Sequence, residues 1–130
     1  MAAEDPSRTV LVVDDSDDIR LLWTEILLAA GYHVLEAADG ARAVEVALQH
    51  RPRVVLMDMA MPNMDGWEAT RRIRAVVNEK EMAIVAVSAM AEVDGRAAAF
   101  RSGCDGFIAK PTTPDVVLEV VRSFVEAPDC

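Results

Sequence analysis

Residues 9–15 read Thr-Val-Leu-Val-Val-Asp-Asp, a short apolar run closed by two acids. Three more stretches repeat this design, an apolar run followed by one polar residue: 54–58 (VVLMD), 83–88 (AIVAVS) and 107–110 (FIAK). Continuous apolar runs rich in Val and Ile are typical of strands buried on both faces of a parallel sheet. The carboxyl ends of parallel strands meet at one edge, where open α/β sheets bind their ligands. We therefore expect the polar residues to converge there: Asp14, Asp15, Asp58, Ser88 and Lys110.

The chemistry of this set is specific. Crowded carboxylates repel one another unless a hard cation holds them, and Mg²⁺ prefers such oxygen ligands. The ammonium of Lys110 and the hydroxyl of Ser88 can bind the oxygens of a phosphoryl group. An aspartate in such a site can act as a nucleophile and become an aspartyl phosphate. The pattern predicts phosphoryl transfer to an acidic side chain.

The rest of the chain alternates strand and helix signals five times, which indicates a parallel sheet with helices on its faces. The expected strands cover 9–14, 33–37, 53–58, 83–88 and 106–110. The expected helices cover 16–30, 40–50, 65–77, 92–102 and 114–126. Right-handed crossovers would place the first and fifth helices on one face and the other three on the opposite face.

Composition narrows the possible function classes. The chain has 130 residues, 52% of them hydrophobic and 27% charged, as expected for one globular domain. A net charge of −9 argues against a nucleic-acid surface. No apolar run approaches the roughly 20 residues that span a bilayer, and residues 1–7 lack a secretory pattern. The two cysteines show no metal or disulfide spacing, so we expect a reduced, cytoplasmic protein without membrane or nucleic-acid partners.

Four segments together resemble the receiver domain of two-component response regulators: 12–15 (VVDD), 57–66 (MDMAMPNMDG), 87–89 (VSA) and 106–111 (GFIAKP). Each segment alone is weak, but their order along nearly the whole chain is specific. The resemblance implies a flavodoxin-like, doubly wound α/β fold with a five-stranded parallel sheet in the order 2-1-3-4-5. It also implies a single receiver domain over 1–130, flexible tails at 1–7 and 127–130, and no output domain.

The resemblance also assigns a metal site. It implies that Asp58 is the phosphoacceptor and that Asp14 and Asp15 are the acidic pair that organises Mg²⁺. Asp58 itself and the backbone carbonyl of Ala60 would be further ligands. Mn²⁺ could take the place of Mg²⁺.

A second group of residues would bind the phosphoryl group and report its presence. By the same resemblance, Ser88 is the switch hydroxyl, Lys110 the phosphate-binding lysine and Phe107 the switch aromatic. A cis peptide bond is implied between Lys110 and Pro111, and X–Pro bonds carry only a small preference for trans.

The implied partners are proteins. A sensor histidine kinase or a histidine phosphotransfer protein would donate the phosphoryl group, and a downstream effector would bind the changed surface. The domain would be a monomer or a weak dimer. It would catalyse only its own phosphorylation and dephosphorylation, so it is not an enzyme acting on a free substrate.

The first helix carries a candidate docking stripe. At about 100° per residue, Leu21 and Leu28 lie together with Thr24 between them, on the face expected to meet solvent. The opposite, core-facing set would be Ile19, Leu22, Trp23, Ile26, Leu27 and Ala30. Exposed leucines are also common without any function, so the stripe has two interpretations.

Two other functions use similar residues. A haloacid dehalogenase-type phosphatase also combines Asp, Ser or Thr, and Lys with Mg²⁺. Its nucleophile, however, lies in an Asp-x-Asp motif after the first strand, where this chain has adjacent Asp14 and Asp15. A pseudo-receiver that only binds a partner is the third possibility, and it is disfavoured because no member of the set is missing.

Overall fold

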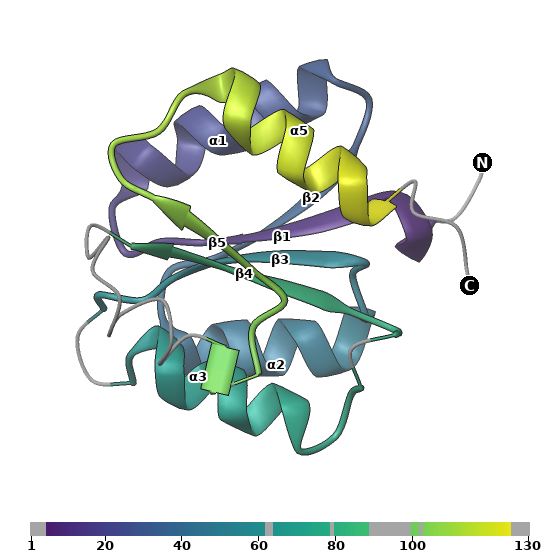
Figure 1. Cartoon of the computed structure of the whole chain (residues 1–130), viewed down its shortest axis with the longest axis vertical. Coiled ribbons are helices and arrows are strands. Elements are labelled where there is room, and N and C mark those ends of the chain that lie inside the picture. The colour runs from purple at the N-terminus through teal and green to yellow at the C-terminus, as the bar shows by residue number, and fades with distance from the viewer. Residues whose placement is uncertain (1–4, 62–63, 79, 89–99, 102, 126–130) are drawn as a thin grey trace.

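The computed structural model describes residues 5–61, 64–78, 80–88, 100–101 and 103–125. Its centre is a sheet of five parallel strands in the order β2-β1-β3-β4-β5 (Figure 1), which confirms the predicted fold class. The strands are β1 (Thr9–Val13), β2 (His33–Ala37), β3 (Val54–Asp58), β4 (Ala83–Ser88) and β5 (Gly106–Ala109).

The strand register brings the predicted polar residues to one edge. Val13 at the end of β1 pairs with Met57, so Asp14 follows β1 beside the point where β3 reaches Asp58. On the other side, Asp58 pairs with Val87 and Ser88 pairs with Ala109, the residue before Lys110. The carboxyl ends of four strands are therefore level with one another.

The described residues form four α-helices, two on each face of the sheet: α1 (Asp17–Ala29), α2 (Gly40–His50), α3 (Gly66–Arg74) and α5 (Pro114–Val125). Helices α1 and α5 cover one face, and α2 and α3 cover the other (Figure 1). Helix α3 ends at Arg74, three residues before the predicted end. Most of the helix expected over 92–102 lies outside the described residues. None of the helices in the described ranges is long and apolar enough to cross a membrane.

Local sequence explains where three helices begin. Ser16, Asp39 and Asp65 each precede a helix and accept a hydrogen bond from the backbone N–H three residues later. This contact satisfies one of the N–H groups that the first turn leaves without a partner. Gly31 follows α1 at φ 97°, a conformation that glycine adopts at no steric cost.

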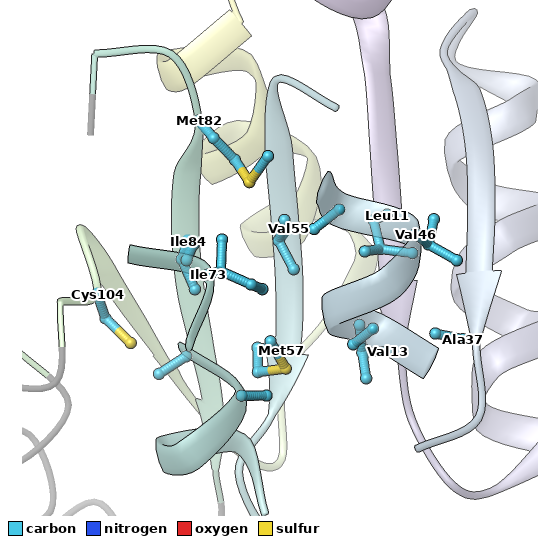
Figure 2. Packing of buried hydrophobic residues seen from close by; sticks show 14 of the residues in the cluster. Leu11, Val13, Ala37, Val46, Val55, Met57, Ile73, Met82, Ile84 and Cys104 are labelled. Atoms are coloured by element: carbon cyan, nitrogen blue, oxygen red, sulfur yellow. The ribbon is translucent and has the colours of Figure 1, made fainter. Parts of the chain in front are cut away.

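Successive residues of the inner strands belong alternately to two hydrophobic clusters, one on each face of the sheet. Leu11 and Val13 of β1 face α2 and α3, whereas Val10 and Val12 face α1 and α5. Figure 2 shows the first cluster, where Val55 and Met57 of β3 lie close to residues of the covering helices. Because both faces are covered, each inner strand is apolar except for one polar residue at an end, which is why its sequence shows no alternation.

The orientation of α1 corrects one prediction. Leu21 and Leu28 are exposed as expected, at 53% and 52%, but Thr24 between them is buried. Ile19 and Leu22, assigned to the core face, are 39% and 49% exposed. The buried side of α1 is therefore rotated by about a quarter turn from the predicted one. Apolarity alone was misleading because Ile19 and Leu22 line an open groove rather than the core.

The N-terminal segment, part of the range 1–7 predicted to be a tail, begins with a short 3-10 helix over Pro6–Arg8. Asp5 caps it by accepting a hydrogen bond from the Ser7 N–H at 3.0 Å. The Thr9 hydroxyl donates to the Asp5 carbonyl at 2.8 Å, which ties this turn to the start of β1. The remaining tail residues, 1–4 and 127–130, lie outside the described part of the chain.

Candidate functional site

Three carboxylates meet where β1 and β3 end. One oxygen each from Asp14, Asp15 and Asp58 lies within 4.8 Å of the other two. Asp14 and Asp58 are buried, at 5% and 4% exposure, while Asp15 is exposed. Like charges at such distances in a partly buried site repel strongly, so the cluster favours a bound cation.

Asp58 lies at the centre of the charged groups. Its Oδ1 accepts a hydrogen bond from the Ala60 N–H at 3.1 Å and lies 3.6 Å from Nζ of Lys110. The same ammonium is 4.0 Å from Oδ2 of Asp14. Burial raises the pKa of Asp58; the Ala60 N–H and Lys110 oppose this rise, and the charges of Asp14 and Asp15 add to it. The net shift of the Asp58 pKa is upward, so burial and the two neighbouring acids together outweigh the Ala60 N–H and Lys110.

A glycine lets the chain pass close behind Asp58. A Cβ atom on Gly66 would lie 2.6 Å from the Asp58 carbonyl oxygen and 2.5 Å from the Met59 sulfur. The Gly66 N–H also donates to the Met59 carbonyl at 3.3 Å. A side chain here would displace the backbone that carries Asp58. Gly66 was not among the predicted site residues, although an Asp-Gly pair soon after Asp58 indicates a tight backbone turn near the site.

The predicted phosphate-binding residues lie on the neighbouring strands. Ser88 is buried at the end of β4, and its carbonyl accepts the Lys110 N–H at 2.8 Å. Phe107 lies on β5, partly buried against the cluster under α2 and α3. The peptide bond between Lys110 and Pro111 is cis. Ser88 and Lys110 are thus joined through their backbones beside the acidic cluster.

Arg20 is a polar neighbour of the site that the sequence analysis missed. Its Nη1 donates to the Asp14 carbonyl at 2.8 Å, its Nε to Glu36 at 3.1 Å and its Nη2 to Asp17 at 2.6 Å. Its side chain is only 15% exposed. The sequence does contain one indication of this role: Arg20 is the single basic residue in an otherwise acidic stretch that begins at Asp14.

An open groove of about 450 Å³ begins beside Lys110. It is lined mainly by apolar side chains, which come from α1, the end of β4, the segment after β5 and the start of α5: Ile19, Leu22, Trp23, Val87, Pro111, Thr112 and Pro114. The predicted docking residues Leu21 and Leu28 are exposed on α1 but are not among those that line the groove. The groove thus joins the charged site to an apolar surface.

The donor set fits magnesium. All three side chains offer carboxylate oxygens, the ligands that this ion prefers, and the cluster includes no His or Cys that would favour zinc. Three oxygens within 4.8 Å of one another are close enough that rotation of their side chains would bring them onto one ion, so these three residues would hold it.

Comparison with known proteins agrees with this geometry. A family model described as the response regulator receiver domain matches residues 10–122. The chemotaxis protein CheY of Bacillus subtilis is 37% identical over 114 residues, which cover 87% of this chain and 93% of CheY. The transcriptional regulatory protein SrrA of Staphylococcus aureus is 35% identical over 115 residues, which cover 88% of this chain and 46% of SrrA. The chain therefore spans about half the length of such longer relatives.

A solved structure supports the same relationship. The receiver domain of a sensor histidine kinase from Pseudomonas aeruginosa superimposes with a TM-score of 0.84 at 30% identity. The match covers 92% of this chain and 98% of that domain, whose structure has a magnesium ion coordinated in the active-site cleft.

Proposed function

The chain belongs to the response regulator receiver domain family, and we propose that it accepts a phosphoryl group on Asp58 from a phosphohistidine donor. The observation that carries this proposal is the meeting of three carboxylates and one ammonium at the carboxyl edge of the sheet. The reaction is magnesium-dependent, because the cluster repels an incoming phosphoryl group unless a cation offsets its charge.

The metal site consists of the carboxylates of Asp14, Asp15 and Asp58 with the Ala60 carbonyl. When bound there, magnesium supplies positive charge to the phosphoryl oxygens; Mn²⁺ can serve in its place. A carboxylate oxygen of Asp58 attacks phosphorus, the bond from phosphorus to the donor imidazole nitrogen breaks, and its electron pair leaves with the imidazole. Catalysis here consists of positioning and charge neutralisation of the domain's own side chain.

Lys110 and Ser88 hold the product. Nζ of Lys110, 3.6 Å from Asp58 in this structure, pairs with one phosphoryl oxygen. The Ser88 hydroxyl donates a hydrogen bond to another, and Phe107 on the neighbouring strand moves with it. This rearrangement changes the surface around β4 and β5, which a downstream effector protein then recognises.

The donor docks on α1. Ile19 and Leu22 line the groove beside Lys110, and Leu21 and Leu28 extend the exposed apolar surface along the helix. Together these four residues form the docking surface. Exposed acids lie beside it at Asp15, Asp17 and Asp18. The donor therefore offers an apolar surface with basic residues at its rim, so that its charge complements this acidic border.

Paired substitutions test the docking surface. Ile19→Glu with Leu22→Glu, and separately Leu21→Glu with Leu28→Glu, should slow transfer from the cognate donor while labelling by acetyl phosphate stays intact. Val76→Glu changes an apolar residue that is 58% exposed just beyond α3, and serves as the matched control. Equal loss with both phosphodonors would refute docking on α1.

No observation favours the two other functions. A phosphatase of the haloacid dehalogenase type would turn over a free phosphate ester, whereas the family match covers residues 10–122 with a signalling domain. A pseudo-receiver would lack part of the acidic cluster, and here the three carboxylates and Lys110 are all together. The family membership also supports action in the cytoplasm as a monomer or weak dimer.

The decisive test is transfer from a phosphorylated histidine kinase or histidine phosphotransfer protein, with and without Mg²⁺. Wild type should take up label only with the metal, and Asp58→Asn should take up none. Glu119→Gln removes the same charge from an exposed position on α5 and should behave as wild type. Label on Asp58→Asn, or metal-independent label on wild type, would contradict the proposal.

A further inference from the structure

We propose that Arg20 is a positioning residue for the metal site, which it organises by holding the peptide group between Asp14 and Asp15. This inference rests on the proposed function, because it gives that acidic pair its role in binding Mg²⁺. It concerns a residue that touches neither the ion nor the phosphoryl group.

The polar groups of Asp14 are held from three directions. Its N–H donates to the Ala37 carbonyl of β2 at 3.2 Å, and its Oδ1 accepts the Ser16 N–H at 2.9 Å. Its carbonyl oxygen accepts Nη1 of Arg20 at 2.8 Å. Arg20 thus holds the one peptide plane that leads from Asp14 to Asp15.

Asp15 depends on this plane more than Asp14 does. Asp15 is exposed, whereas Asp14 is packed at the buried end of β1. The direction of the Asp15 side chain therefore follows from the orientation of the preceding peptide. If that peptide rotates, the Asp15 carboxylate moves away from the oxygens of Asp14 and Asp58, and the set of ligands is broken.

The guanidinium is itself held in place. Nε of Arg20 donates to Glu36 on β2 and Nη2 donates to Asp17 in the first turn of α1, so three nitrogens bind three separate acceptors. Its side chain is 15% exposed. A lysine carries the same charge but cannot reach three acceptors with a planar fork. The geometry, rather than the charge, is what arginine contributes here.

Charge and positioning predict opposite effects on metal affinity. The guanidinium is a cation near the cluster, so if it acted only through its charge, its removal would lower repulsion and tighten Mg²⁺ binding. If it positions the peptide, its removal weakens binding, and Arg20→Lys weakens binding as well. Residues that orient ligands from outside the coordination shell typically change metal affinity by about 10-fold or more.

The test is a Mg²⁺ titration of the whole chain by calorimetry, without a phosphodonor. Arg20→Ala and Arg20→Lys should each raise the Kd for Mg²⁺, by about 10-fold for the alanine variant. Arg42→Ala should leave it unchanged, because Arg42 makes a similar pair with Glu45 on the exposed side of α2. Wild-type or tighter affinity in Arg20→Lys, or in Arg20→Ala, would overturn the proposal.

Two features keep the outcome decisive. Should Arg20→Ala fail to fold, Arg20→Lys carries the test alone because it keeps the charge, and an unchanged Kd in Arg20→Lys would overturn the proposal. Should wild type bind Mg²⁺ but never become phosphorylated on Asp58, the proposed function fails while the role of Arg20 stands.

Discussion

Asp58→Asn should stabilise the metal-free protein. The substitution keeps the shape of the side chain and leaves an oxygen for the Ala60 N–H, but it removes one buried charge from the acidic cluster. An acidic residue that destabilises its own fold is expected where the site is built for a cation.

The distances set the size of the effect. At an effective dielectric constant of about 20, two unit charges at the 4.8 Å upper limit of these oxygen–oxygen distances repel by about 3.5 kcal/mol, and Asp58 forms two such pairs, with Asp14 and Asp15. Its attraction to Lys110 at 3.6 Å is about 4.6 kcal/mol on the same scale. The repulsion therefore exceeds the attraction by about 2 kcal/mol at low salt. For a chain of this size that corresponds to a rise of about 8 °C in Tm.

Thermal and urea unfolding at low ionic strength with EDTA measure this difference. Glu119→Gln, which removes an exposed charge on α5, should change the free energy of unfolding by less than about 0.5 kcal/mol. Adding Mg²⁺ should stabilise wild type more than Asp58→Asn, because the variant has lost one ligand. Asp58→Asn that is no more stable than Glu119→Gln without metal would refute the electrostatic account of the site.

Three further perturbations test other parts of the structure. Burial raises the pKa of Asp58 above its ordinary 3.8, so the folded state binds this proton more tightly than the unfolded state. The free energy of unfolding without metal should therefore fall as pH rises through the window above 3.8, and Asp58→Asn should lack this slope. Arg74→Ala should cost about 3 kcal/mol in urea unfolding. Arg74 donates to the carbonyls of Gly103 at 2.8 Å and Met82 at 2.6 Å and pairs with the carboxylate of Asp105. Burial raises the pKa of Cys104 to about 11, so in a Cys130→Ser background its thiol should react slowly with a disulfide reagent until the protein unfolds.

Each of these has a control and a contrary outcome. Equal pH dependence in wild type and Asp58→Asn would assign the slope to other groups. Arg72→Ala breaks an exposed pair with Glu68 and should cost less than about 1 kcal/mol; an equal cost for Arg74→Ala would show that its contacts add no stability. Labelling of folded Cys104 at the rate of the unfolded chain would contradict its burial.

The strands and the acidic cluster could be predicted because each depends on residues close together in sequence. Apolar runs such as 54–57 indicate strands buried on both faces, and the polar residue that ends each run, such as Asp58, must lie at the carboxyl edge of a parallel sheet. Strand order came from the family resemblance, since the runs themselves do not say which strands are neighbours.

What could not be predicted depends on how elements pack. The apolar residues Ile19 and Leu22 of α1 look like core in a helical projection, but they border a groove whose other wall comes from residues after β5. Arg20 of α1 donates a hydrogen bond to Glu36 on β2, and the local sequence of α1 does not indicate that partner. The role of Gly66 needs the path of the backbone behind Asp58.

The central claim is that Asp58 receives the phosphoryl group. Incubation with acetyl phosphate and Mg²⁺, borohydride reduction of the acyl phosphate and peptide mass mapping would locate the modified residue directly. We predict one modified residue, Asp58, and no modification when EDTA replaces the metal. Modification at another carboxylate while Asp58 remains unchanged, or the same modification without metal, would contradict the account.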